Sequence, residues 1–481
     1  MREKLIAGTA ALTLAYTAWG FAGVIAWSLH TMLAGGLLTL LLALWPAGEG
    51  RRASGALARI PRILRCPQFY AIFAFLGYLA LAALNPAWEI ASNDEGWWLA
   101  PVEPPLADWL PTSVQSSYEP MNPWRIFNMH LAAFSLALGL KLGLKRRRSL
   151  LFVLWAFLIS SVLMAGVAIF QKYSGAAQVL WTYDSENPSF WGSFFYRNQG
   201  VAFLNWTVVI AGVLYFYHAG RSRLEGRSGG PHFLAFCLIA PLVVSVGLAL
   251  SRGGILFAAI LTVAFLLLVC IDYAVHTLAQ TSRHTLPITL FLTLALASLL
   301  GLGLFQAYRA IDWEAVEQRF GDIDATIENA DRDARVLSSK MTWEMARDQL
   351  WMGWGAGSFR YAFPMYQKRE PALFYARYHP KRGWSGRKFY RYAHNDLLQF
   401  LAEYGVVGSS LLVVALLSFL SPLWSAVRSH SLALLFFGVG LTCVFAHAFF
   451  EFIFHSPAYW VAFIGGLTLV SRLLQLEARR G

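Results

Sequence analysis

Arginine, histidine and amide side chains stand at the ends of apolar segments, where they could bind an anion and move a proton. Ser251-Arg-Gly-Gly254 separates two apolar segments, so Arg252 falls at the start of the next predicted helix. Free N–H groups at a helix N-terminus, two glycines and a guanidinium together predict an anion site around Ser251 and Arg252. The alternative is a tight turn whose arginine only extends to lipid headgroups.

A second motif of this kind is Phe194-Phe-Tyr-Arg-Asn-Gln-Gly200, which also precedes an apolar segment. It places Arg197 and Asn198 at the end of a predicted helix, in the same kind of position as Arg252. Two such motifs favour a functional anion site over two unrelated turns.

A third pair of arginines, Arg332 and Arg335, could bind the same anion. Both precede a predicted amphipathic helix that ends at the glycine-rich segment 353–358. Glycine clusters are more typical of helix-terminating turns than of phosphate-binding loops, so the cluster alone indicates no phosphate site. The sequence does not decide between Arg332 and Arg335 as the ligand.

The segment that begins at His394 combines a titratable ring with a polar stripe. Asn395, Gln399 and Glu403 recur at every fourth position of an otherwise apolar predicted helix. In a membrane such a stripe faces protein or a water-filled cavity, so we expect these three side chains to support a site. Histidine titrates near physiological pH, so His394 is a candidate general base; a purely structural interfacial histidine is the alternative.

The composition is that of an integral membrane protein. Of 481 residues, 57% are hydrophobic and only 14% are charged, and long apolar stretches recur throughout the chain. In lipid the backbone must satisfy its own hydrogen bonds, and stretches this long and continuous indicate helices rather than the alternating strands of a barrel. The predicted fold class is an all-α membrane protein with about twelve transmembrane helices.

The apolar stretches place these helices within a few residues at each end. The predicted spans are 5–27, 29–45, 68–84, 126–144, 149–170, 200–219, 233–250, 255–273, 286–306, 397–420, 431–450 and 458–471. The chain then divides into transmembrane helices 1–9 in residues 1–306, a large helical extracytoplasmic loop in 307–396, and helices 10–12 with a cytoplasmic tail in 397–481.

The distribution of charge orients these spans. Arginine and lysine concentrate in alternate short loops, including residues 51–65, 145–148 and 221–227, which the positive-inside rule places in the cytoplasm. The acidic loop 85–125 and the long loop 307–396 then lie outside. The many basic residues of 351–394 predict either a surface for an anionic or sugar substrate or attraction to anionic lipid headgroups.

An acidic pair, Asp322 and Asp324, raises the possibility of a metal site, because carboxylate oxygens bind divalent cations. Neighbouring residues are acidic and helix-like, so a solvated surface is the preferred interpretation. His447 and Glu451 are polar groups near the end of the eleventh span and are candidates to support the site. The sequence therefore predicts no metal and no cofactor.

Several of these segments resemble the bacterial O-antigen ligase and O-antigen polymerase superfamily. The similarity extends over about 150–470 and is most specific in the segment His394-Asn-Asp-Leu-Leu-Gln-Phe-Leu-Ala-Glu-Tyr-Gly-Val-Val-Gly408. Weaker parts are the Ser251 and Tyr196-Arg-Asn-Gln motifs, the glycine-rich segment Gly353 to Phe359, and Phe445-Ala-His-Ala-Phe-Phe-Glu-Phe452.

The resemblance implies transfer of a glycan from an undecaprenyl-pyrophosphate carrier to an acceptor hydroxyl, on lipid A core or on a growing glycan. Members of this superfamily are GT-C-like, inverting and metal-independent enzymes of the bacterial inner membrane, with the active site on the periplasmic face. Carried over to this chain, His394 is the catalytic histidine, and Arg252 and Arg335 bind pyrophosphate, with Arg197 matched less closely. The predicted partners are therefore lipid-linked glycans and the bilayer, and no nucleic acid.

Three other functions remain open at this point. A polysaccharide polymerase would use the same chemistry with a glycan acceptor, and a protein O-oligosaccharyltransferase would use a protein hydroxyl. A transporter or flippase would place ionisable groups near the bilayer midplane, whereas here they concentrate at helix ends. This position favours chemistry at one membrane face.

Overall fold

A computed structural model describes most of the chain. The described residues are 1–479 except 46–61, 95, 117–121, 186–188, 228, 274–333, 380–382 and 428–430. They form two compact units. The first unit comprises the described residues up to 153 together with 334–421 and 448–471, and the second comprises 154–273, 422–447 and the segment from 472 onward.

The predicted fold class is confirmed, because the described ranges contain nine helices that are long and apolar enough to cross a bilayer. They are α2 (Ala26–Leu44), α3 (Pro67–Leu84), α4 (Pro123–Gly143), α5 (Arg147–Tyr173), α6 (Arg197–Leu224), α8 (Arg252–Tyr273), α14 (Asp396–Leu420), α16 (Leu432–Phe450) and α17 (Pro457–Ala478). The seventh predicted span is the shorter apolar helix α7 (His232–Leu248), and the ninth, 286–306, lies outside the described residues.

The first predicted span, 5–27, is wrong at its C-terminal end. Helix α1 (Arg2–Thr17) stops ten residues earlier, and a 3-10 turn, η1 (Phe21–Gly23), follows with Ala22 at a φ of 54°. This turn is packed inside the first unit, where a Cβ on Gly23 would come within 2.6 Å of the Pro457 side chain. A buried turn is as apolar as a helix, so hydropathy did not separate the two.

Small residues let two helices of the first unit approach closely. A Cβ on Gly36 of α2 would lie 2.5 Å from the Ala132 carbonyl oxygen of α4, and one on Gly139 would lie 2.8 Å from the Leu40 nitrogen. Close backbone contact at small residues is a common way for helices to pack in membranes, where no hydrophobic driving force acts between them.

Helix α4 begins at Pro123, and the Asn122 side chain caps it by accepting from the Trp124 N–H.

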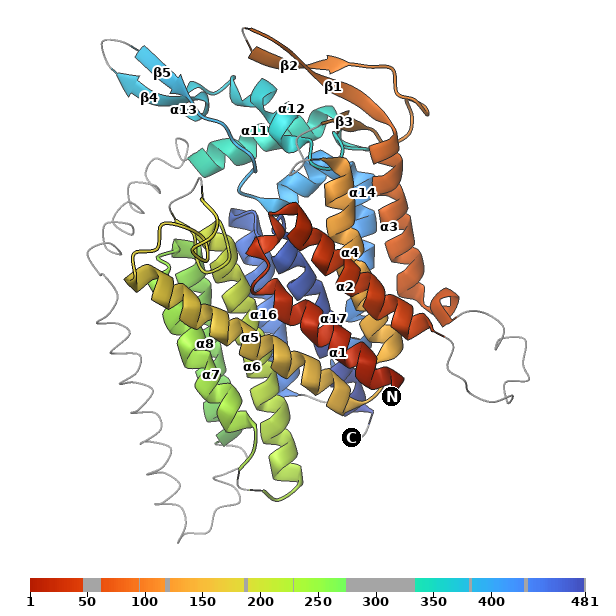
Figure 1. The fold of residues 1–481 in the computed structure, drawn as a ribbon, viewed down its shortest axis with the longest axis vertical. Helices are drawn as coiled ribbons and strands as arrows, with labels where there is room; N and C mark the ends of the chain where they lie inside the picture. The colour runs from red at the N-terminus through yellow and green to blue at the C-terminus, as the bar shows by residue number, and fades with distance from the viewer. Residues whose placement is uncertain are drawn as a thin grey trace. The chain divides into compact units, whose positions relative to one another are not determined.

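Short helices and strands cover one end of the first unit (Figure 1). The helices are α11 (Ala334–Asp348), α12 (Phe359–Gln367) and α13 (Pro371–Phe374). Strands β1 (Pro86–Asn93), β2 (Gly96–Pro101) and β3 (Ser113–Gln115) form a sheet in the order β2-β1-β3, and β4 (Tyr375–His379) pairs with β5 (Gly383–Arg387). The loop 307–396, predicted to be helical, thus contains the hairpin β4-β5 in addition to helices.

A break in α14 explains the glycine-rich segment 353–358. Gly405 has non-helical angles within α14, and Gly353 and Gly355 also have positive φ. The N–H groups of Trp354 and Gly355 donate to the carbonyls of Ala402 and Glu403, so the glycine-rich segment satisfies backbone groups that the break exposes. A Cβ on Gly353 would lie 2.4 Å from the Glu403 carbonyl oxygen, which excludes larger residues there.

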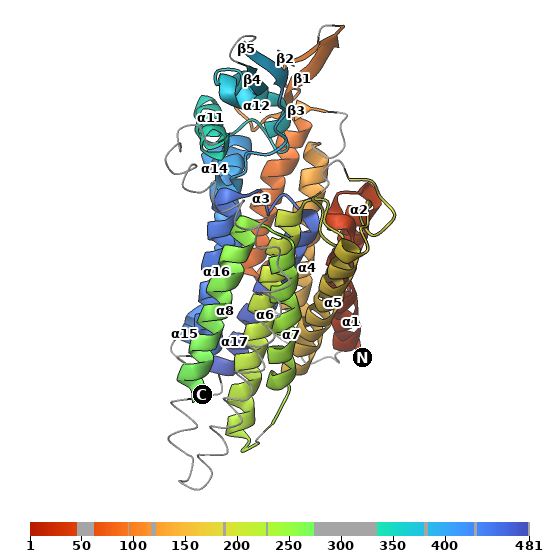
Figure 2. The ribbon, with the colours of Figure 1, turned by 90° about the vertical axis from the view of Figure 1, so that its left-hand side faces the viewer.

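Helices α6, α7 and α8 pack against one another in the second unit, as Figure 2 shows. Asn205 of α6 donates from its side chain to the Gly254 carbonyl at the start of α8, over 3.0 Å. A Cβ on Gly254 would lie 2.0 Å from the Val201 side chain of α6, so the start of α8 is held close to α6. This contact fixes the N-terminus of α8, where Arg252 stands.

Candidate active site

His394 lies in the first unit, just before the start of α14, and its backbone is unusual. Its φ is 55°, in the left-handed region that non-glycine residues seldom occupy. Asn395 is the N-cap of α14, and its side chain accepts from the Leu398 N–H over 3.1 Å. The chain therefore turns at His394, and Asn395 caps the helix that follows.

Glu451 joins His394 to Arg335. One Glu451 carboxylate oxygen accepts from Arg335 Nη2 of α11 at 2.5 Å, and the other lies 3.3 Å from His394 Nδ1. The Glu451 side chain is only 4% exposed, against 24% for His394 and 50% for Arg335. A buried carboxylate thus links an accessible imidazole to an accessible guanidinium.

This arrangement suits a general base. A carboxylate on Nδ1 selects the tautomer with a proton on Nδ1 and stabilises the imidazolium that forms when Nε2 accepts a proton. Aromatic rings fix the imidazole further, since Phe452 packs edge-on against it with ring centroids 4.9 Å apart. Tyr390 also packs edge-on against His394, at 6.5 Å.

Gln399 and Glu403 of the predicted polar stripe bond to the protein itself. Gln399 accepts from the Ala393 N–H at 2.9 Å and donates to Glu403 at 3.0 Å. The Glu403 carboxylate accepts from the N–H groups of Gly357 and Phe359, at the start of α12. These two side chains therefore hold the segment before His394 and the N-terminus of α12. They face protein, which is one of the two environments predicted for the stripe.

Arg197, Asn198, Ser251 and Arg252 belong to the second unit and are described within it. Arg197 is the first residue of α6, and Arg252 is the first residue of α8, as the motifs predicted. Asn198 donates to the Tyr196 hydroxyl at 2.8 Å, and Ser251 Oγ accepts from the Gly254 N–H at 3.3 Å. Ser251 therefore caps the helix on which Arg252 stands.

Three further predicted residues, Arg332, Asp322 and Asp324, lie outside the described residues. Of the two arginine candidates, the structure therefore places only Arg335, which it brings to Glu451. His447 of the second unit packs against Phe257 of α8, with ring centroids 5.0 Å apart. Among the described residues, no group of three or more His, Cys, Asp or Glu side chains is placed to hold a metal ion.

Residues 233–413 match the family model described as O-antigen ligase. The matched region includes Arg252, Arg335 and His394, whereas Arg197 and Glu451 lie outside it. The match confirms the resemblance to the O-antigen ligase superfamily. No curated protein matches the chain.

Together with the apolar helices, this match supports a membrane glycosyltransferase of the O-antigen ligase and polymerase type. Such an enzyme acts on a lipid-linked glycan and an acceptor. The sequence predicts Glu451 only as a supporting residue near the end of the eleventh span, and its contact with His394, 57 positions earlier, comes from the tertiary structure.

Proposed function

We propose that this O-antigen ligase superfamily member transfers a glycan from undecaprenyl pyrophosphate to a hydroxyl of lipid A core, at the periplasmic face of the bacterial inner membrane. The contact between His394 and Glu451, with Arg335 on the same carboxylate, supports this proposal most directly. Proton removal and anion stabilisation are the two tasks of the reaction, and these side chains suit both.

In the proposed step the acceptor hydroxyl oxygen attacks the anomeric carbon of the donor sugar. The bond from that carbon to the pyrophosphate oxygen breaks, and the configuration at the carbon inverts. The hydroxyl proton passes to His394 Nε2, and Glu451 stabilises the resulting imidazolium. The carrier leaves as undecaprenyl pyrophosphate, with the extra negative charge on its oxygen.

Guanidinium groups stabilise that leaving group in this proposal. Arg335 donates from Nη2 to Glu451, and its guanidinium is half exposed. The planar guanidinium group matches the geometry of phosphate oxygens. Arg252 and Arg197 stand at helix N-termini, which also favour anions. Fixed positive groups supply the stabilisation that a metal ion supplies in other transferases.

The periplasmic location is tested by the orientation of the chain. We expect reporter fusions after residues 148 and 226 to be cytoplasmic and fusions after residues 110 and 370 to be periplasmic, because arginine concentrates near the first two positions. Paired alkaline phosphatase and fluorescent protein fusions measure this directly. A cytoplasmic signal after residue 370 would contradict the proposal, since residue 370 lies between α11 and His394 in the loop that the proposal places outside.

The acceptor is tested by deleting the gene and examining the glycans. A ligase mutant is expected to accumulate long carrier-linked glycan and to leave the lipid A core unsubstituted. Single repeat units on the core would instead identify a polymerase, and unchanged lipopolysaccharide with an unglycosylated protein would identify a protein O-oligosaccharyltransferase. Complementation with the wild-type gene is the control, and electrophoresis of lipopolysaccharide is the measurement.

A further inference from the structure

His394 and Glu451 each lie in a segment between helices, outside any helix or strand. His394 ends the stretch before α14, and Glu451 follows the end of α16 in the turn 451–456. Their 3.3 Å contact therefore depends on how these two segments are held against each other. A shift of about 1 Å at such a contact can cost about 10²-fold in rate.

A second pair of side chains joins the same two segments. Asp396, the residue that opens α14, is fully buried, and one of its oxygens accepts from the Phe454 N–H at 2.8 Å. Its other oxygen lies 2.5 Å from His455 Nδ1. Asp396 is two residues after His394, and His455 is four residues after Glu451, so this connection runs beside the contact between His394 and Glu451.

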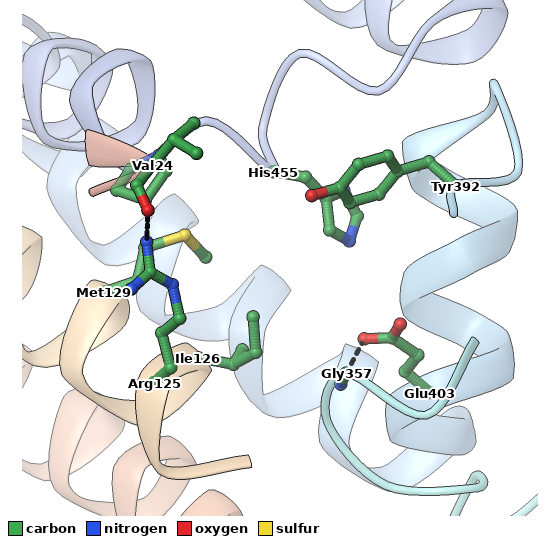
Figure 3. Close-up of a pocket in the computed structure, with 9 residues that line it drawn as sticks. Val24, Arg125, Ile126, Met129, Gly357, Tyr392, Glu403 and His455 are labelled. Atoms are coloured by element: carbon green, nitrogen blue, oxygen red, sulfur yellow. Dashed lines mark hydrogen bonds between the residues drawn. The ribbon is translucent and has the colours of Figure 1, made fainter. Parts of the chain in front are cut away.

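The second nitrogen of the His455 ring points into a cavity of the first unit. The cavity has a volume of about 30 Å³ and is lined by His455, Glu403, Arg125 and Tyr392 among others, as Figure 3 shows. His455 Nε2 is buried and has no hydrogen-bond partner in the part of the chain that the structure describes. A cavity above roughly 10–15 Å³ holds one water molecule, which would accept from Nε2.

Two carboxyl groups and one guanidinium lie around His455. Asp396 bonds to its Nδ1, Glu403 lines the same cavity, and Arg125, which also lines it, donates to the carbonyls of Gly23 and Val24. Burial disfavours a charged ring, but the hydrogen bond and charge of Asp396, with the charge of Glu403, raise the pKa of His455. The two side chains are therefore held by a short, buried hydrogen bond of 2.5 Å.

We propose that Asp396 and His455 are positioning residues for glycan transfer, which hold the Glu451 segment against His394 so that the carboxylate meets His394 Nδ1. The proposal rests on the proposed role of His394 as the base. The His455 side chain is 4% exposed and bonds to Asp396 rather than to His394, so it acts through the backbone of 451–456. Tyr392 reinforces this link, because it stacks on Phe452 at 4.4 Å and packs against His455 at 5.3 Å.

Three replacements of His455 separate its hydrogen bond from its bulk and polarity. In His455→Asn the amide nitrogen can take the place of Nδ1 and donate to Asp396, whereas the longer side chain in His455→Gln places its amide at the position of Nε2. His455→Leu removes the polar atoms at both the Nδ1 and the Nε2 positions. We expect kcat to fall about 10²-fold in the Leu and Gln variants, with the donor KM within about twofold, and the Asn variant to recover about tenfold of this loss.

A double-mutant comparison tests whether His455 acts on the Glu451 contact. Glu451→Gln should lower kcat about 10²-fold in the wild-type background but only about twofold in His455→Leu, because the contact is already lost there. The rates are measured on purified enzyme in nanodiscs, with thermal unfolding midpoints recorded at the same pH. A residue that only stabilises the fold would give independent, multiplied losses.

The outcomes are distinguishable from failure of the proposed function. If His394→Asn is inactive while His455→Leu has wild-type kcat, the positioning proposal is wrong and the role of His394 stands. Multiplied losses in the double variant, or equal rates for the Asn and Gln variants, also overturn it. If His394→Asn keeps full activity, the proposed function fails first, and any His455 effect is then structural.

Discussion

Replacing His394 with glycine should lower the rate of glycan transfer by about 10²–10⁴-fold, the contribution typical of a positioned general base. Glycine is the suitable replacement because it adopts the φ of 55° that this position requires, so the variant should unfold at the wild-type temperature or above. Steady-state rates and unfolding midpoints of the purified protein measure the two effects. Wild-type rates in this variant would exclude His394 as the base.

Chemical rescue makes this test specific for proton transfer. Exogenous imidazole should restore part of the activity of His394→Gly, because it can occupy the space of the missing ring beside Glu451 and Phe452. It should not restore His394→Asn, whose amide fills that space while tolerating positive φ. His30→Ala, on an exposed part of α2, is the matched control and should keep the wild-type rate. Equal rescue of both His394 variants would contradict a base at this position.

Arg252→Ala should lower kcat by about 10²–10³-fold, which is the usual cost of removing one fixed donor to a developing negative charge. The guanidinium stands on the first residue of α8, where the helix N-terminus adds to its field. Arg252→Lys should recover only part of the loss, because a single ammonium cannot replace two parallel N–H donors on phosphate oxygens. The measurement is transfer rate against concentration of undecaprenyl-pyrophosphate-linked donor.

A matched control for Arg252 exists on α6 of the same unit. Arg221 forms an ion pair with Glu225 at 2.6 Å near the predicted cytoplasmic end of that helix. Arg221→Ala should leave the rate within about twofold of wild type, since exposed pairs of this kind contribute little. If Arg252→Ala behaves like Arg221→Ala, the arginine serves only to anchor the helix end, and the pyrophosphate site must be sought elsewhere.

Local patterns in the sequence determined much of the fold and part of the site. The helix α14, the N-terminal positions of Arg197 and Arg252 on α6 and α8, and the amphipathic helix α11 all follow from hydropathy and capping residues near each position in the chain. Such features depend on neighbours within a few residues, so one sequence suffices to read them. The same local basis failed at α1, where a buried turn is as apolar as a helix.

Only the tertiary structure decided which distant groups meet. Glu451 contacts His394 across 57 residues, Asp396 bonds to His455 across 59, and Glu403 accepts from the Phe359 N–H of α12 across 44. A carboxylate in an apolar segment predicts that a partner exists, because burying a carboxylate alone is costly. The sequence does not predict which residue that partner is. That choice follows from the packing of whole segments, which the spacing of residues along the chain does not record.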